Sequence, residues 1–289
     1  MKASDFEFLA DFLIKDSGLA LQPEKEYLLN SRLIPVAEAA GLDGIEGLVE
    51  ELRRGAGQQL RTAVTEAMTT NETLFFRDKT PFEELKDVLL PALIPARADA
   101  RRLRIWCTAA SSGQEPYTIA MILHDFFPQL GCWDIEILAT DISRDILKQA
   151  EDGEYSQFEV QRGLPIQSLV EHFDQSGTRW RIKDHLRQRI QFRHQNLLSG
   201  FGHLGEFDVV FCRNVLIYFD TETKRDVLER TRRVIADDGY LLLGAAETVM
   251  GVTKQFERYR DCKSGVYRPA DVRPRATGTH NARRVAATT

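Results

Sequence analysis

The apolar positions of the first 68 residues recur at the spacing of amphipathic helices. The side chains that carry this pattern are Phe6, Leu9, Leu13, Leu28, Leu29 and Leu33. Turn-forming residues interrupt it near positions 16–18, 41–44 and 55–57. The pattern predicts an all-helical domain of about four helices over residues 1–68.

Short, strongly apolar runs replace this pattern after Arg101. They are "LRIWC" (103–107), "IEILAT" (135–140), "FDVVFC" (207–212) and "YLLLG" (240–244). Stretches at helical spacing separate them, at Glu115–Phe127, Arg144–Ala150 and Glu222–Ile235. Alternation of buried strands and helices predicts a doubly wound α/β domain around a mostly parallel sheet, covering residues 81–267.

A segment at about residues 153–193 interrupts the alternation. It is too long for a connecting loop, and "TRWRI" and "RIQFR" alternate like strands near a turn at Gly177. We therefore expect a small antiparallel β insert in the α/β domain. Residues 268–289 lack periodicity and contain five arginines and one acid, which predicts a disordered basic tail.

Composition limits the classes of partner and the cellular compartment that we expect for this protein. Of the 289 residues, 43% are hydrophobic and 28% are charged, and the net charge of -5 provides no field that attracts nucleic acid. There is no signal peptide and no run of about 20 apolar residues, so we expect no membrane insertion. The four cysteines are far apart, which argues against a cysteine zinc site or a disulfide framework. These features predict a cytoplasmic protein without a bound metal.

The residues after the first predicted strand suggest a ligand with a positive charge. An open α/β sheet binds ligands at the carboxyl ends of its strands, and here "TAASSGQEPYTIAM" allows close backbone approach. It lacks GxGxxG, and Glu115 at the start of a helix leaves no room for a pyrophosphate, which disfavours NAD or FAD. An ammonium or a sulfonium fits an acid there; a Glu115 that only caps its own helix is an equally good interpretation.

Two further strand ends carry polar residues. Asp141 in "LATDIS" is placed to accept ribose hydroxyls, although aspartate also commonly opens a helix. Arg213 and Asn214 leave an apolar strand together, and a buried arginine needs a partner. Tyr218, taken alone, is best explained by aromatic packing. Together the strand ends favour a nucleoside with a charged amino-acid-like tail, which is S-adenosylmethionine rather than a dinucleotide.

Five motifs in one order resemble the chemotaxis receptor methyltransferases, the CheR family. They are "TTNETLFFRD" (69–78), "ASSGQEPYTIA", "ATDIS", "NLL" (196–198) and "CRNVLIYF", and the resemblance extends from about Leu13 to Tyr267. It implies a Rossmann-like class I S-adenosylmethionine-dependent methyltransferase sheet with a small antiparallel insert, preceded by a helical domain. It also implies that residues 69–80 are a linker that contributes to the cofactor site.

The resemblance carries over a set of site residues. It implies that the cofactor contacts are Asn71, Thr73, Arg77, Glu115, Asp141, Asn196, Leu197, Arg213 and Asn214. Tyr218 matches a tyrosine near the transferred methyl group and is the candidate catalytic residue, whereas Phe75 and Phe76 are expected to pack the linker against the sheet domain.

The implied reaction is methyl transfer from S-adenosylmethionine to glutamate side chains of transmembrane chemoreceptors, which leaves S-adenosylhomocysteine. The implied partner is the cytoplasmic helical bundle of the receptor, bound by a monomer that regulatory proteins can also bind. The candidate docking arginines are Arg32, Arg53, Arg54 and Arg61, although such charges usually form only a solvated face. Two alternatives share the cofactor pocket: a methyltransferase for a small molecule or RNA, and a non-catalytic module that senses the cofactor or its product.

Two departures from the family pattern bear on these expectations. The insert has Gly177 alone at its turn, where relatives that grip a C-terminal receptor tether carry extra glycines, so we expect no dependence on a tether. Where the family usually has His-Ser-Glu, this chain reads "GAAETV", with Ala246 before Glu247. We expect a structural variation there without loss of activity.

Overall fold

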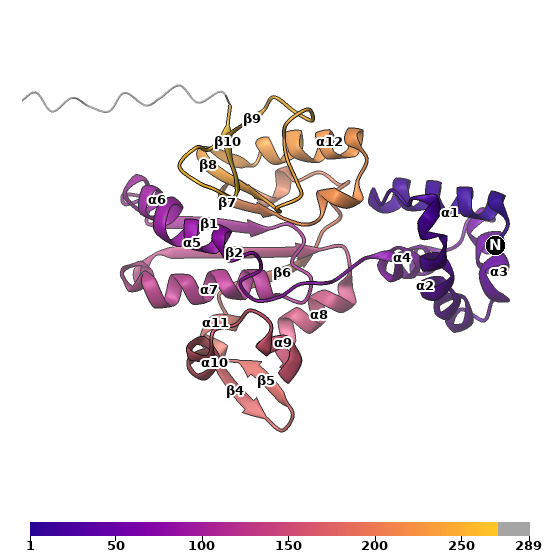
Figure 1. The fold of residues 1–289 in the computed structure, drawn as a ribbon, viewed down its shortest axis with the longest axis horizontal. Coiled ribbons are helices and arrows are strands. Elements are labelled where there is room, and N and C mark those ends of the chain that lie inside the picture. The colour runs from indigo at the N-terminus through magenta and orange to yellow at the C-terminus, as the bar shows by residue number, and fades with distance from the viewer. Residues whose placement is uncertain (271–289) are drawn as a thin grey trace, which may run out of the picture.

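A computed structural model of the chain describes residues 1–270. The N-terminal region is a helical bundle made of α1 (Ala3–Ser17), the 3₁₀ turn η1 (Pro23–Lys25), α2 (Glu26–Ala39), α3 (Gly44–Arg53) and α4 (Gln58–Met68). Its core contains the leucines that the helical spacing singled out, including Leu9, Leu13, Leu29 and Leu33, none of which is exposed. The bundle lies beside the sheet domain and is joined to it by an extended segment (Figure 1).

Within residues 1–270, seven strands form one sheet in the order β6-β2-β1-β7-β8-β10-β9. Their bounds are β1 (Arg102–Cys107), β2 (Asp134–Asp141), β6 (Ile190–His194), β7 (Phe207–Cys212), β8 (Ile235–Leu243), β9 (Phe256–Arg258) and β10 (Gly265–Pro269). The strands from β6 to β8 are parallel, and β10 is antiparallel to β8 and β9. The strand order reverses at β1, so the carboxyl ends of β1, β2 and β7 border a crevice suited to a ligand.

Helices cover both faces of this sheet, as the apolar runs predicted. Successive strand residues alternate between two cores: Ile105 and Cys107 belong to one and Trp106 to the other. The helical segments are α5 (Thr80–Glu84), the π-helical turn η2 (Leu85–Leu89), α6 (Leu90–Ala96), α7 (Gln114–Phe126), the 3₁₀ turn η3 (Pro128–Cys132), α8 (Arg144–Asp152) and α12 (Thr221–Arg232). Helices α7 and α12 lie on opposite faces (Figure 1).

The insert differs from its prediction in one strand. It comprises β3 (Glu154–Ser156), α9 (Gln157–Gln161), α10 (Ile166–His172), β4 (Phe173–Ser176), β5 (Arg179–Ile182) and α11 (Asp184–Arg187). The antiparallel pair around Gly177 is β4 with β5, whereas "RIQFR" lies in β6 and pairs in parallel with β2. The prediction was wrong there because an edge strand of the main sheet, half covered by helices, shows the same alternation as an insert strand.

The ends of several helices and strands also differ from the prediction. The helix expected to reach Ile235 ends at Arg232, and the structure adds α5, η2 and α6 and the strands β9 and β10, which the apolar runs did not reveal. Strand β10 extends to Pro269, and the rest of the predicted tail, residues 271–289, lies outside the described residues. None of the helices in residues 1–270 combines the length and apolar character needed to cross a membrane.

The linker packs closely against the insert. The Phe75 ring is buried and lies edge-on to Tyr155 at 5.0 Å and to Phe173 at 5.6 Å between ring centroids. Gly163, in the turn before α10, allows this approach: its φ is +85°, and a Cβ there would overlap the Phe75 carbonyl oxygen and lie 2.9 Å from the Leu74 side chain. A side chain at position 163 would therefore force linker and insert apart.

We expect Gly163→Ala to lower the free energy of unfolding by about 3 kcal/mol, from a left-handed backbone and from the overlap. Gly177→Ala is the matched control, because its φ is +59° but nothing lies within 4 Å of the added Cβ. It should cost only about 1 kcal/mol. Urea unfolding of both variants measures the difference, and equal losses would show that the overlap has no energetic weight.

Candidate functional site

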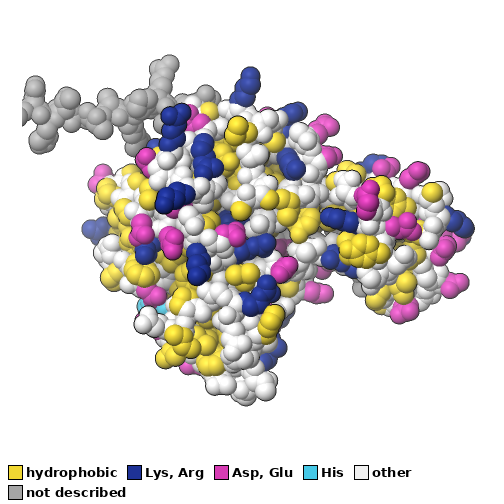
Figure 2. Space-filling view, viewed as in Figure 1, with side chains coloured by type: hydrophobic (Ala, Val, Ile, Leu, Met, Phe, Trp, Pro, Cys, Tyr) yellow, Lys and Arg dark blue, Asp and Glu magenta, His cyan; other side chains and the backbone are white. Residues whose placement is uncertain are grey.

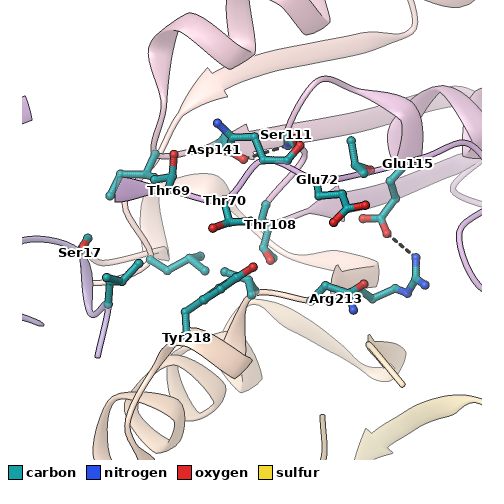
Figure 3. A pocket seen from close by; sticks show the side chains of 18 of the residues that line it. Ser17, Thr69, Thr70, Glu72, Thr108, Ser111, Glu115, Asp141, Arg213 and Tyr218 are labelled. Atoms are coloured by element: carbon teal, nitrogen blue, oxygen red, sulfur yellow. Dashed lines mark hydrogen bonds and ion pairs between the residues drawn. The ribbon is translucent and has the colours of Figure 1, made fainter. Parts of the chain in front are cut away.

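A pocket of about 940 Å³, counting its open mouth, lies at the carboxyl ends of β1, β2 and β7. Its walls come from the linker, the helical bundle and the strand ends. All ten side chains expected from the sequence line it: Asn71, Thr73, Arg77, Glu115, Asp141, Asn196, Leu197, Arg213, Asn214 and Tyr218. Figure 3 shows side chains from the linker and from the strand ends facing one another across this pocket.

The carboxylate of Asp141 is held at the end of β2 by two backbone groups. The Ser111 N–H donates to Oδ2 at 2.9 Å and the Ser143 N–H to Oδ1 at 3.0 Å. The residue is buried, which raises the pKa of Asp141 above its usual value despite these bonds. Each carboxylate oxygen accepts more than one hydrogen bond, so Asp141 retains capacity to bind hydroxyl groups of a ligand.

Arg213 joins three segments of the chain. Its Nη1 donates to Glu115 Oε2 at 2.8 Å, and its Nη2 donates to Asp78 Oδ2 at 2.7 Å and to the Arg77 carbonyl at 3.0 Å. Its side chain is only 1% exposed, so the end of β7, the first turn of α7 and the linker are tied together inside the protein. The sequence analysis expected a partner for a buried Arg213, and the structure provides two carboxylates, those of Glu115 and Asp78.

Glu115 is more constrained than the sequence indicated. Burial raises the pKa of the Glu115 carboxyl, and Arg213 opposes that rise. Arg213 and Glu115 are buried, whereas the Asp78 side chain is 40% exposed, and the Arg77 guanidinium also acts on Glu115.

Several bonds fix the linker over the pocket. Arg32 in α2 donates to the carbonyls of Met68 and Thr69, both at 2.8 Å, and Ser111 Oγ donates to the Asn71 carbonyl at 2.8 Å. Arg77 donates to the Glu72 carbonyl at 2.8 Å. Three non-glycine residues within four positions of the linker have positive φ angles: Phe76, Asp78 and Lys79. Such conformations persist only where surrounding contacts enforce them, as functional segments often require.

The helical bundle also reaches the site. Ser17 and Leu19 line the pocket, and the Ala20 N–H donates to the Tyr218 carbonyl at 2.8 Å. The Asn196 side chain donates to the Asp16 carbonyl at 2.7 Å and accepts from the Leu198 N–H at 2.9 Å. The polar atoms of Asn196 therefore hold the bundle against the sheet domain.

Glu247 organises the loop that carries Asn214 and Tyr218. One carboxylate oxygen accepts from the backbone of Asn214 at 2.7 Å and Gly244 at 2.6 Å. The other accepts from the N–H groups of Val215 at 2.9 Å, Leu216 at 2.7 Å and Ile217 at 3.3 Å. The 3₁₀ turn η5 (Leu216–Tyr218) thereby has its N-terminal amides satisfied by one buried carboxylate.

The residue-by-residue prediction left out twelve of the residues that line the pocket, three of which lie in the predicted linker, residues 69–80. The twelve are Ser17, Leu19, Thr69, Thr70, Glu72, Thr108, Ala109, Ser111, Ile142, Gln195, Val215 and Phe219. Most are neighbours of predicted residues, and this adjacency was the available signal. Thr108 is the most informative, because its hydroxyl is buried and has no hydrogen-bond partner within the described residues. A buried hydroxyl in a pocket wall calls for a polar ligand group.

Comparison with known proteins gives matches over most of the chain. Residues 4–69 match the CheR methyltransferase, all-alpha domain, and residues 71–264 match the CheR methyltransferase, SAM binding domain. Chemotaxis protein methyltransferase 1 of Pseudomonas aeruginosa is 43% identical over 268 residues, which cover 91% of this chain and 96% of that protein. Chemotaxis protein methyltransferase Cher2 of Pseudomonas putida is 41% identical, with the same coverage.

We expect Glu247→Gln to weaken binding of S-adenosylhomocysteine by about tenfold and to destabilise the fold by about 1–3 kcal/mol, because an amide N–H₂ replaces one acceptor facing the loop. Glu84→Gln is the matched control. Glu84 is also buried and accepts from the backbone of Lys263 and Ser264, but it does not line the pocket. Titration calorimetry should show unchanged affinity for that control. Unchanged affinity in Glu247→Gln would contradict a positioning role.

Proposed function

The chain belongs to the CheR methyltransferase family, and from this premise we propose that it transfers methyl groups to glutamate side chains of chemoreceptors and forms methyl esters. Family membership and the relatives that match over 96% of their own length make it an S-adenosylmethionine-dependent methyltransferase of chemotaxis. The acceptor group and the roles of single residues are the proposed part.

The observation that carries the proposal is the chemistry of the pocket wall. Asp141 would hold the ribose hydroxyls, and Glu115 would offset the positive charge of the amino-acid tail. The unpartnered Thr108 hydroxyl supplies a further polar contact. The other contacts to S-adenosylmethionine would come from Asn71, Thr73, Arg77, Asn196, Leu197, Arg213 and Asn214.

The chemistry does not require a catalytic base. S-adenosylmethionine supplies a methyl group on a sulfonium, whose C–S bond electrons remain on sulfur after transfer. An acceptor glutamate has a pKa of about 4.3 and is already ionised at neutral pH, so its oxygen attacks the methyl carbon without losing a proton. The protein's contribution is alignment, which is worth roughly 7 kcal/mol or more, and exclusion of water while opposite charges neutralise.

Tyr218 is the residue we assign to orienting the acceptor carboxylate. It lies in η5 beside the pocket, and its side chain points toward the linker and Thr108 in Figure 3. Its backbone is fixed from two sides, by Ala20 of the bundle and by the Glu247 carboxylate that binds the loop. A hydroxyl held in this way can donate a hydrogen bond to the attacking carboxylate.

The acceptor is proposed to be the helical bundle of a receptor on the cytoplasmic side. The insert turn carries Gly177 alone, which supports action without a receptor tether. The arginines considered for docking all have partners within the chain: Arg32 binds the linker, Arg61 pairs with Asp16, Arg53 with Asp5 and Arg54 with Glu50. Arg32 is committed to the linker, whereas the side chains of Arg53 and Arg54 are exposed in their ion pairs and remain open to a partner. We propose that the enzyme acts as a monomer.

Incubation of the full chain with receptor-containing membranes and methyl-labelled S-adenosylmethionine tests the acceptor group. We expect label on the receptor that alkali releases as methanol, because esters hydrolyse in base whereas methylated nitrogen does not. Alkali-stable label, or label on RNA alone, would refute glutamate as the acceptor.

We expect Tyr218→Phe to lower turnover by about 10–100-fold through loss of one orienting hydrogen bond, with cofactor affinity within about twofold of the wild type. Steady-state methylation and calorimetric titration with S-adenosylhomocysteine separate these two effects. Normal turnover in this variant would reject the orienting role.

A further inference from the structure

Three of the six histidines of the chain gather at the junction between the sheet domain and the insert. His124 comes from the last turn of α7, His172 from the end of α10 and His185 from α11. Their ring centroids lie 4.8 Å apart for His124 and His185, and 5.6 Å apart for His124 and His172. Figure 1 shows α10 and α11 on the side of the sheet that α7 covers, and the three imidazole rings meet there.

Two carboxylates complete this cluster. Ligand atoms of His124, Asp125 and Glu171 all lie within 4.8 Å of one another, and the three side chains are exposed. A tetrahedral zinc site with bonds of about 2.0–2.1 Å holds its ligand atoms roughly 3.4 Å apart. Binding of an ion would close that difference by rotation of these exposed side chains.

The electrostatics of the junction favour a cation. Asp125 and Glu171 form no ion pair with lysine or arginine among residues 1–270, and both lie in the last turns of helices, where the partial charge is negative. Lys183 opposes this attraction, since its ammonium donates to the Glu171 carbonyl at 2.6 Å.

His172 serves as a support for the cluster. It is fully buried, and its Nε2 lies 3.0 Å from an Asp125 carboxylate oxygen, while its Nδ1 has no partner within the described residues. Because an ionised carboxylate only accepts hydrogen bonds, the His172 Nε2–H donates to Asp125. Partners of this kind orient the ligands of metal sites.

We propose that His124, Asp125 and Glu171 bind a divalent transition metal ion of the zinc class, with His185 adjacent. Imidazole together with carboxylates suits zinc or nickel rather than magnesium or calcium. Glu115 and His124 are nine residues apart on α7, so the site lies roughly 14 Å along the helix from the pocket. A bound ion would connect α7 to α10 and fasten the insert to the sheet domain, whatever the acceptor of the methyl group.

Zn²⁺ titration of the untagged full chain by calorimetry tests the proposal. All proteins carry Cys132→Ser, because this exposed thiol is a competing ligand. We expect one equivalent of Zn²⁺ to bind the parent, and His124→Ala/Glu171→Gln to weaken that binding by at least about tenfold. Zn²⁺ should raise the melting temperature of the parent but not of this double variant, because binding to the folded state alone stabilises it.

The matched control is His203→Ala/Glu206→Gln. It removes the same side-chain types from another exposed surface segment and should keep the parent affinity. Absence of saturable binding by the parent would overturn the proposal. Equal affinity in the two double variants would do the same.

Discussion

The buried Arg213 guanidinium is the contact on which the rest of the site depends. It forms a buried pair with Glu115 at the start of α7 and reaches the partly exposed Asp78 in the linker, so its charge holds the segment between the two domains over the strand ends. Removing one member of a buried ion pair costs about 3–5 kcal/mol, because the other is left unpaired. The linker is therefore set in place by the same residues that line the pocket, and the helical bundle becomes part of the site.

Carboxylates that bind backbone amides arrange the remaining walls before any ligand arrives. Asp141 fixes the loop after β1, and Glu247 fixes the loop after β7 through N–H groups from Asn214 to Ile217. Such preorganisation suits a reaction whose nucleophile is already ionised, since orientation and dryness are what the protein must supply. This chain has Ala245 and Ala246 where the family usually has His-Ser before the glutamate. Both alanines are exposed, and the Glu247 carboxylate is buried and binds the loop.

Local patterns predicted the fold better than they predicted long-range pairing. Strands such as Phe207–Cys212 were evident because strands buried on both faces are continuously apolar, whereas Ile190–His194 was assigned to the wrong sheet because alternation does not identify a partner strand. The need of Arg213 for a partner followed from its burial, but Asp78 and Glu115 are far away in sequence. The histidine cluster was invisible for the same reason, since its members come from three elements.

Calorimetric titration with S-adenosylhomocysteine of Arg213→Met beside Arg97→Met tests the central claim most directly. Arg97 is also a largely buried arginine that pairs with two carboxylates, Asp208 and Asp238, but it lies outside the pocket. If Arg213 closes the site, Arg213→Met should bind at least about tenfold more weakly than the wild type, while Arg97→Met loses stability but keeps its affinity. Equal affinity in the folded Arg213→Met protein and the wild type would contradict the account.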